Sequence, residues 1–151
     1  MRRALAPIIC MCLLLAGAPA RAASLPAIDA AAFGIELCPQ SVCGAAIFTG
    51  LLNGRVGTTR ASGSFAVAVT HEPLPDPGAQ SAITGGVFDI RFGLRSIHGL
   101  VTGGTLENLG NNTFMVTITL IAADGSELTF EGLLNHNVFP PTIVGRLTSG
   151  L

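Results

Sequence analysis

Residues 113–134 read TFMVTITLIAADGSELTFEGLL, and this stretch decides the fold class. Apolar side chains occupy every second position from Phe114 to Leu120, with threonine or methionine between them. A period of two is typical of a strand that lays one face on a core. Asp124-Gly125 favours a tight hairpin turn, and the alternation resumes over residues 127–134. The sequence therefore predicts an antiparallel hairpin.

The same pattern continues along the chain, which predicts an all-β protein of about seven or eight antiparallel strands. Five more strands are expected over residues 46–52, 63–70, 83–94, 97–106 and 142–148. Turn signals lie at 53–54, 93–96 and 110–112. Prolines mark residues 72–80 and 135–141 as long connections, because proline is excluded from central strands. We expect these two connections to form the functional end of the domain.

Glycine recurs inside the predicted strands, at Gly50, Gly85-Gly86, Gly103-Gly104, Gly132 and Gly145. Glycine weakens a strand, so its recurrence needs a reason. Tight bending at the corners of a small closed barrel supplies one. A compositional drift toward glycine is the alternative explanation. The sequence thus favours a small antiparallel β-barrel over a barrel-like sandwich of two sheets.

The first 22 residues match a cleavable signal peptide. Arg2 and Arg3 precede an apolar core at 8–15, and Ala20-Arg21-Ala22 offers a cleavage site before Ala23. A membrane anchor is the alternative, but the apolar stretch is shorter than the roughly 20 residues that span a bilayer. We therefore expect export to the periplasm or the extracellular space.

Residues 23–44 are expected to form an N-terminal lead, followed by a single β-domain over 45–151. The alanine-rich part of the lead, up to Phe33, is compatible with a short helix that begins after Pro26 and stops at Gly34. Cys38 and Cys43 remain after cleavage, and two cysteines in an exported chain predict a disulfide. A redox pair or a zinc site is the alternative for these cysteines.

Composition argues against several classes of partner. After cleavage the chain carries five arginines and nine acidic residues, with no lysine, tyrosine or tryptophan. This balance argues against binding nucleic acid, which requires basic patches and stacking side chains. Short predicted strands and the lack of an aromatic girdle argue against a membrane-embedded barrel. We therefore expect neither nucleic-acid binding nor membrane insertion.

The segment from Gly86 to His98 contains one group of candidate binding residues. Asp89 and Arg91 share one face of a predicted strand, and His98 lies near them across the next hairpin. If that face is the barrel interior, the three side chains line a cavity suited to a polar ligand. If it faces water, Asp89 and Arg91 form an ordinary surface ion pair.

A second group comprises His71, which opens the first proline-containing connection, and His136, which lies in the second. The two would meet if both connections lie at the same end of the barrel. A metal site would need a third ligand such as Asp76. Two histidines in polar loops are more often exposed or capping groups, so no metal and no cofactor is predicted.

The sequence contains no recognised catalytic motif, which favours a non-enzymatic role. We expect a binding protein for a small or polar ligand, whose identity the sequence does not specify. A structural or surface-interaction protein is the first alternative. A hydrolase that uses His98 or His136 as a general base is the second.

Overall fold

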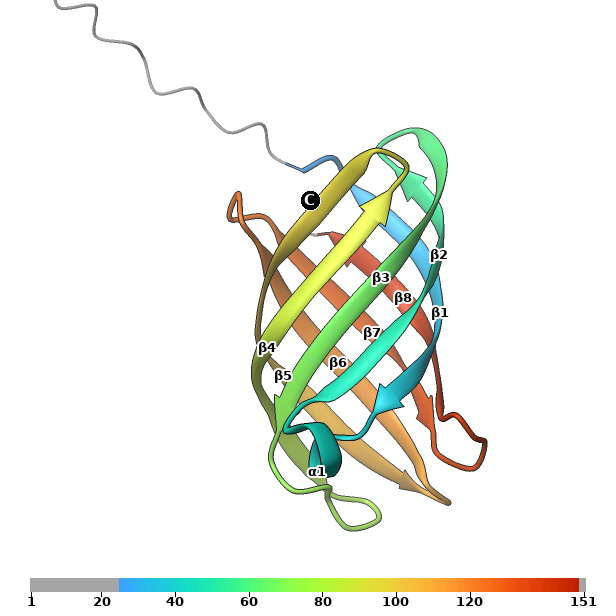
Figure 1. The fold of residues 1–151 in the computed structure, drawn as a ribbon, viewed down its shortest axis with the longest axis vertical. Coiled ribbons are helices and arrows are strands. Elements are labelled where there is room, and N and C mark those ends of the chain that lie inside the picture. The colour runs from blue at the N-terminus through green and yellow to red at the C-terminus, as the bar shows by residue number, and fades with distance from the viewer. Residues whose placement is uncertain (1–24, 150–151) are drawn as a thin grey trace, which may run out of the picture.

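The structure is a computed structural model and describes residues 25–149. This part of the chain forms a closed barrel of eight antiparallel strands (Figure 1). Each strand pairs with the next in the chain, and the last pairs with the first. The predicted antiparallel barrel is confirmed, and the sandwich alternative is wrong. The elements are β1 (Ile28–Cys38), α1 (Gln40–Cys43), β2 (Ala46–Val56), β3 (Thr59–His71), β4 (Gln80–Phe92), β5 (Arg95–Gly110), β6 (Thr113–Ala122), β7 (Glu127–Asn135) and β8 (Thr142–Ser149).

The hairpin of β6 and β7 forms where the alternation predicts it. Asp124 and Gly125 lie in the turn, and Gly125 has a φ of 84°. The Asp124 carboxylate accepts a hydrogen bond from the backbone N–H of Ser126 at 3.0 Å. This bond holds the pKa of Asp124 below its usual value. Residues within the turn thus supply hydrogen bonds and a backbone conformation that favour it.

The alanine-rich lead is a strand, so the short helix expected there is wrong. In β1 the buried side chains alternate with exposed ones, and Ile28, Ala30 and Ala32 point inward. The strand pairs with β2 on one side and with β8 on the other. Pairing on both sides outweighs the helix propensity of alanine, which amounts to only tenths of a kcal/mol per residue.

The turn expected at Asn53-Gly54 is also wrong, because both residues lie within β2 and pair with β1. The turn comes later, at Gly57-Thr58. A Cβ on Gly54 would lie 2.9 Å from the Cβ of Ala30. Gly54 therefore allows two strands to approach closely and does not form a turn.

Two Thr-Gly-Gly segments mark bulges in β4 and β5. The pairing of β4 with β3 shifts opposite Thr70 and His71, and the pairing of β5 with β6 shifts between Val101 and Gly103. Gly86 and Gly104 both have φ near 148°, a conformation that other residues rarely adopt. Each bulge adds one residue to its strand. The inward-pointing side chains therefore lie at odd-numbered positions before the bulge and at even-numbered positions after it.

Aromatic rings fill the space that paired glycines leave inside the barrel. Gly34 pairs with Gly50, and a Cβ on either would lie 2.6 Å from the ring of Phe65. Gly132 pairs with Gly145 in the same way beneath Phe130. Glycine in these strands thus makes room for a phenylalanine from the same or a neighbouring strand.

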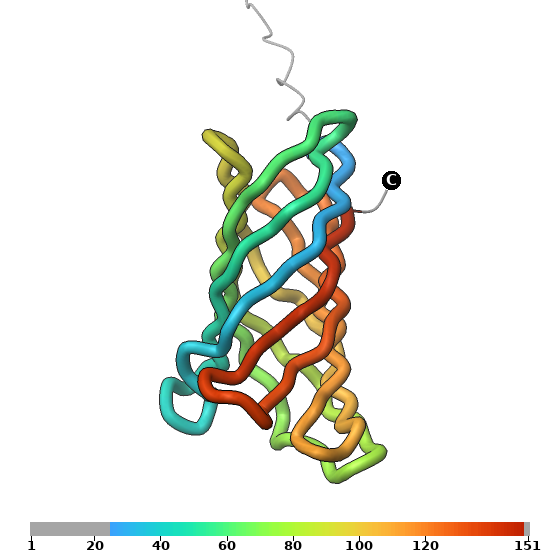
Figure 2. Tube along the Cα trace, turned by 90° about the vertical axis from the view of Figure 1, so that its right-hand side faces the viewer, coloured from blue at the N-terminus to red at the C-terminus, as the bar shows by residue number. Residues whose placement is uncertain are grey.

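The two ends of the barrel differ. Figures 1 and 2 show short turns at one end and the longer connections, with α1, at the other. The apolar interior is filled near its middle, where a gap of only about 30 Å³ remains among residues such as Leu52, Phe88 and Phe130. Inward side chains therefore form a core, as expected for an eight-stranded barrel.

An ion pair joins the first and last strands on the outer surface. Arg146 in β8 donates two hydrogen bonds to the Asp29 carboxylate in β1, at 2.6 and 2.7 Å. The guanidinium holds the pKa of Asp29 below its usual value, and the carboxylate raises the pKa of Arg146. The pair bridges the seam that closes the barrel.

The glycine beneath Phe130 should not tolerate a side chain. We expect Gly132→Ala to lower the free energy of unfolding by about 1–3 kcal/mol, because the new Cβ overpacks the interior. Urea denaturation measures the change. Gly103→Ala is the matched control, because its Cβ would have no neighbour closer than 3.9 Å. Equal losses in both variants would contradict this account of the strand glycines.

The ion pair between Asp29 and Arg146 should make the free energy of unfolding depend on pH. Because the folded-state pKa of Asp29 is depressed, its contribution is present above the unfolded pKa and is lost as pH falls through the folded pKa. We expect Arg146→Gln to be less stable than the wild type near neutral pH. The difference should shrink below about pH 4, measured by thermal unfolding across a pH series. Arg60→Gln, an exposed arginine on β3, should show no such convergence.

Candidate functional site

A cavity of about 280 Å³ lies at the end of the barrel that carries α1 and the two proline-containing connections. Its floor is apolar and includes Phe48, Val116 and Ile118. The remaining lining residues are Glu36, Pro39, Gln40, Ser41, Ala46, Val69, His71, Pro73, Leu74, Ile83, Leu106, Leu134 and His136. The barrel interior is thus a packed core in one part and a cavity in another.

Glu36 is the charged side chain most deeply buried in this cavity. It continues the inward row of β1 and is 6 % exposed. Its Oε2 atom lies 3.1 Å from Nε2 of His136. The backbone holds Glu36 in place, because its N–H donates to the carbonyl of Pro141 at 2.9 Å. A carboxylate and an imidazole therefore meet inside the barrel mouth.

His136 reaches Glu36 from the connection that follows β7. Its backbone N–H donates to the carbonyl of Asn112 at 2.9 Å, which ties two connections together. Its ring packs against Phe114 with 5.4 Å between ring centroids and an interplanar angle of 57°. Backbone and ring contacts together aim the imidazole at the cavity.

The contact between Glu36 and His136 leaves polar groups unsatisfied. Nε2 of His136 is buried and makes no hydrogen bond, so the 3.1 Å approach to Glu36 is a close contact without hydrogen-bond alignment. Among residues 25–149 no donor makes a hydrogen bond to the Glu36 carboxylate. An ionised carboxylate has about four acceptor positions, so the site has unused capacity to accept hydrogen bonds.

Gln40 fastens α1 to the rim of the barrel. Its amide N–H donates to the backbone carbonyl of His71 at 2.8 Å, and its amide oxygen accepts from the backbone N–H of His71 at 2.7 Å. The ring of His71 uses Nδ1 for a contact with the carbonyl of Glu72. Gln40 and His71 are therefore occupied mainly in shaping the rim.

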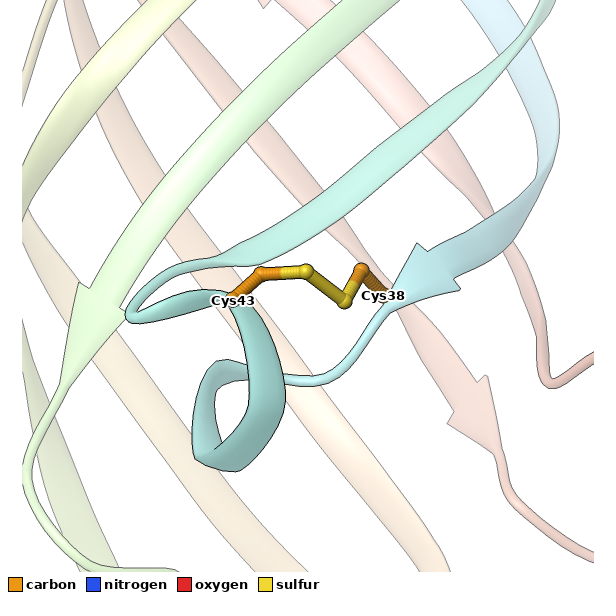
Figure 3. The surroundings of a disulfide bond; sticks show 2 residues. All are labelled: Cys38 and Cys43. Atoms are coloured by element: carbon orange, nitrogen blue, oxygen red, sulfur yellow. A yellow bond between two sulfur atoms is a disulfide. The ribbon is translucent and has the colours of Figure 1, made fainter.

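Cys38 and Cys43 form the disulfide that the sequence predicts, and Figure 3 shows it spanning the two ends of the segment that contains α1. The Cα atoms of the two cysteines are 6.1 Å apart. Because Pro39, Gln40 and Ser41 line the cavity, the disulfide closes the loop that forms part of the cavity wall.

The structure separates the two groups of candidate residues. His71 and His136 line the same cavity, so the two proline-containing connections meet at one end. Asp89 and Arg91 lie on the outer face of β4, where they form an ion pair of 2.9 Å. His98 lies opposite Asp89 on β5 and is exposed. Such an exposed pair contributes about 0–1 kcal/mol.

Sequence reasoning missed Glu36, although a signal for it was present. Ile28, Ala30, Ala32, Gly34 and Glu36 form a row of period two. Treated as a strand, this row would have placed a carboxylate on the core side. The interpretation of the alanine-rich lead as a helix hid the pattern.

Within residues 25–149 no group of three or more histidine, cysteine, aspartate or glutamate side chains is arranged to hold a metal ion. None of the helices in that range is long and apolar enough to cross a membrane. The predicted signal peptide, residues 1–22, lies outside the described part of the chain.

Comparisons with protein-family models, with curated proteins and with solved structures found no match. The geometry of the cavity therefore carries the functional argument.

Loss of the disulfide should loosen the rim. We expect Cys38→Ser/Cys43→Ser to lower the free energy of unfolding by about 2 kcal/mol, because a short loop is no longer closed in the unfolded chain. Faster hydrogen exchange should be confined to α1 and the adjoining strand ends. A reductant should destabilise the wild type but leave the double variant unchanged. An equal effect of reductant on both proteins would contradict the assignment.

Proposed function

We propose that this protein is an exported, non-enzymatic binding protein that takes up a small ligand in the cavity at the end of its barrel. The observation that carries the proposal is a cavity of about 280 Å³ with an apolar floor and a buried carboxylate at its side. Ligand sites are typically concave and mostly apolar, with a few polar groups that fix orientation.

The size and lining of the cavity indicate what kind of molecule fits. At roughly 30 Å³ for each water-sized group, the cavity has room for about nine such groups. Phe48, Val69 and Ile83 offer apolar surface to the ligand. Removal of apolar surface from water stabilises a complex by about 25 cal/mol for each Å² that is buried. This favours a ligand with an apolar body.

The distribution of polarity supports an aqueous surrounding. The inward rows are apolar, and charged residues such as Asp29, Glu131 and Arg146 lie on the outer surface. Membrane-spanning barrels commonly have a polar interior, whereas the inward rows of this barrel are apolar. The disulfide and the predicted signal peptide support export to an oxidising compartment.

Support for the hydrolase alternative is limited to one contact. His136 lies beside Glu36, as a general base beside an orienting acid would. Within the described residues no hydrogen bond joins a histidine ring to a serine or threonine hydroxyl. The contact therefore favours binding over nucleophilic catalysis.

An outward apolar row supports the second candidate, a surface-interaction protein. Five side chains on adjacent paired strands, each at least 37 % exposed, form this row: Leu51, Phe33, Val144, Leu133 and Met115. Contiguous exposed apolar surface is typical of contact sites. A surface role does not depend on the cavity, so a cavity-filling variant distinguishes the two candidates.

Calorimetric titration with linear alcohols from butanol to dodecanol tests the binding proposal. We expect saturable binding of one molecule that is strongest near octanol. Ala46→Leu should weaken octanol binding by about tenfold or more, because the added methylenes occupy the cavity. Ala31→Leu, on the outer face of β1, is the matched control and should bind as the wild type does.

Native mass spectrometry of protein purified from its own host provides a second readout. A co-purifying small molecule, absent from Ala46→Leu, would support the proposal. Absence of binding by the wild type across the whole alcohol series, together with no co-purifying molecule, would overturn it.

A further inference from the structure

We propose that the ligand carries a protonated amine, bound by Glu36, on an apolar body of about eight carbon atoms. This inference rests on the proposed function and names the class of ligand that the same cavity takes. It follows from the charge of the cavity, the hydrogen-bonding state of its polar groups and its size.

Glu36 gives the cavity its acceptor character. Its side chain is 5 % exposed. Among the described residues, the ionisable group in contact with it is the imidazole of His136. A buried carboxylate is costly unless it is paired and hydrogen-bonded. A ligand that brings a cation and several N–H donors would satisfy it.

No cavity-lining residue supplies a strong positive charge. The lining contains no arginine, and the sequence contains no lysine. A carboxylate or phosphate head would therefore lie beside Glu36 without a guanidinium or ammonium to compensate it. This arrangement disfavours fatty acids and phosphate esters as ligands.

The other polar groups of the rim do not change this preference. The Gln40 amide already makes two hydrogen bonds to the backbone of His71, and Nδ1 of His71 contacts the carbonyl of Glu72. Orientation of a charged ligand head is thus left mainly to Glu36.

His136 lies beside the same carboxylate, but its Nε2 atom is buried and not open to a ligand head. Its Nε2 lies 3.1 Å from the Glu36 oxygen and makes no hydrogen bond. A primary ammonium has three donors, and an ionised carboxylate has about four acceptor positions. An ammonium can therefore use more of the free acceptor positions of Glu36 than a hydroxyl with one donor can.

The volume sets the length of the apolar body. Room for about nine water-sized groups is of the order that an ammonium head with a chain of about eight carbon atoms needs. The walls beside such a body include Phe48, Ile83 and Leu106. Octylammonium is therefore the probe that matches both the head and the length.

Titration calorimetry with three ligands of equal chain length tests the inference: octylammonium, octanol and octanoate at neutral pH. The wild type should bind octylammonium about tenfold more tightly than octanol, the factor expected for one hydrogen bond to a charged group. Octanoate should bind most weakly. This comparison uses the unmodified protein, so it does not depend on the folding of any variant.

Glu36→Gln then assigns the preference to the carboxylate. The variant should bind octylammonium and octanol within about twofold of each other. Glu131→Gln removes the same charge from the outer face of β7 and should retain the preference of the wild type. Thermal unfolding confirms that both variants are folded.

The outcomes separate the two proposals. Equal binding of octylammonium and octanol by the wild type would overturn the amine head and leave the cavity proposal intact. Survival of the amine preference in Glu36→Gln would overturn the role of Glu36. Failure of all three ligands to bind, together with no binding across the alcohol series and no co-purifying molecule, would overturn the proposed function itself.

Discussion

Closure of the barrel by β1 is the constraint on which the rest of the structure depends. Without β1, β2 and β8 would each leave a row of unpaired backbone groups. Once β1 is paired on both sides, its side chains must alternate between interior and surface. The same alternation that buries Ile28 then carries Glu36 into the mouth of the barrel. Fold and site are therefore consequences of one pairing.

The interior of an eight-stranded barrel is narrow enough that side-chain size decides whether it is core or cavity. Near the middle, Phe65 and Phe130 cover paired glycines and leave almost no space. At the end that carries α1, a small side chain at Ala46 lies among residues that surround an opening. A short helix and a disulfide shape this rim, so the cavity forms where strands give way to connections.

The sequence was most informative where structure is local. The β6–β7 hairpin could be predicted because its alternation and its Asp124-Gly125 turn lie within one short stretch. β1 could not, because its alanines favour a helix locally and its partner β8 lies more than a hundred residues away. The bulges at Gly85 and Gly103 also shift the inward row, which no fixed period describes. Glu36 was missed because β1 was not recognised as a strand, and only in a strand does the Glu36 side chain point inward.

Glu36 is hard to explain by stability alone. An apolar side chain at the end of the inward row would bury area without desolvating a charge, and replacement of buried ion pairs by apolar residues is often neutral or stabilising. His136 offsets only part of that cost, because its Nε2 makes no hydrogen bond. Departures from good packing and full polar satisfaction are expected mainly at functional sites. A carboxylate with unused acceptor positions, fixed by the backbone in an apolar cavity, therefore supports the proposal that a ligand supplies the other half of the interaction.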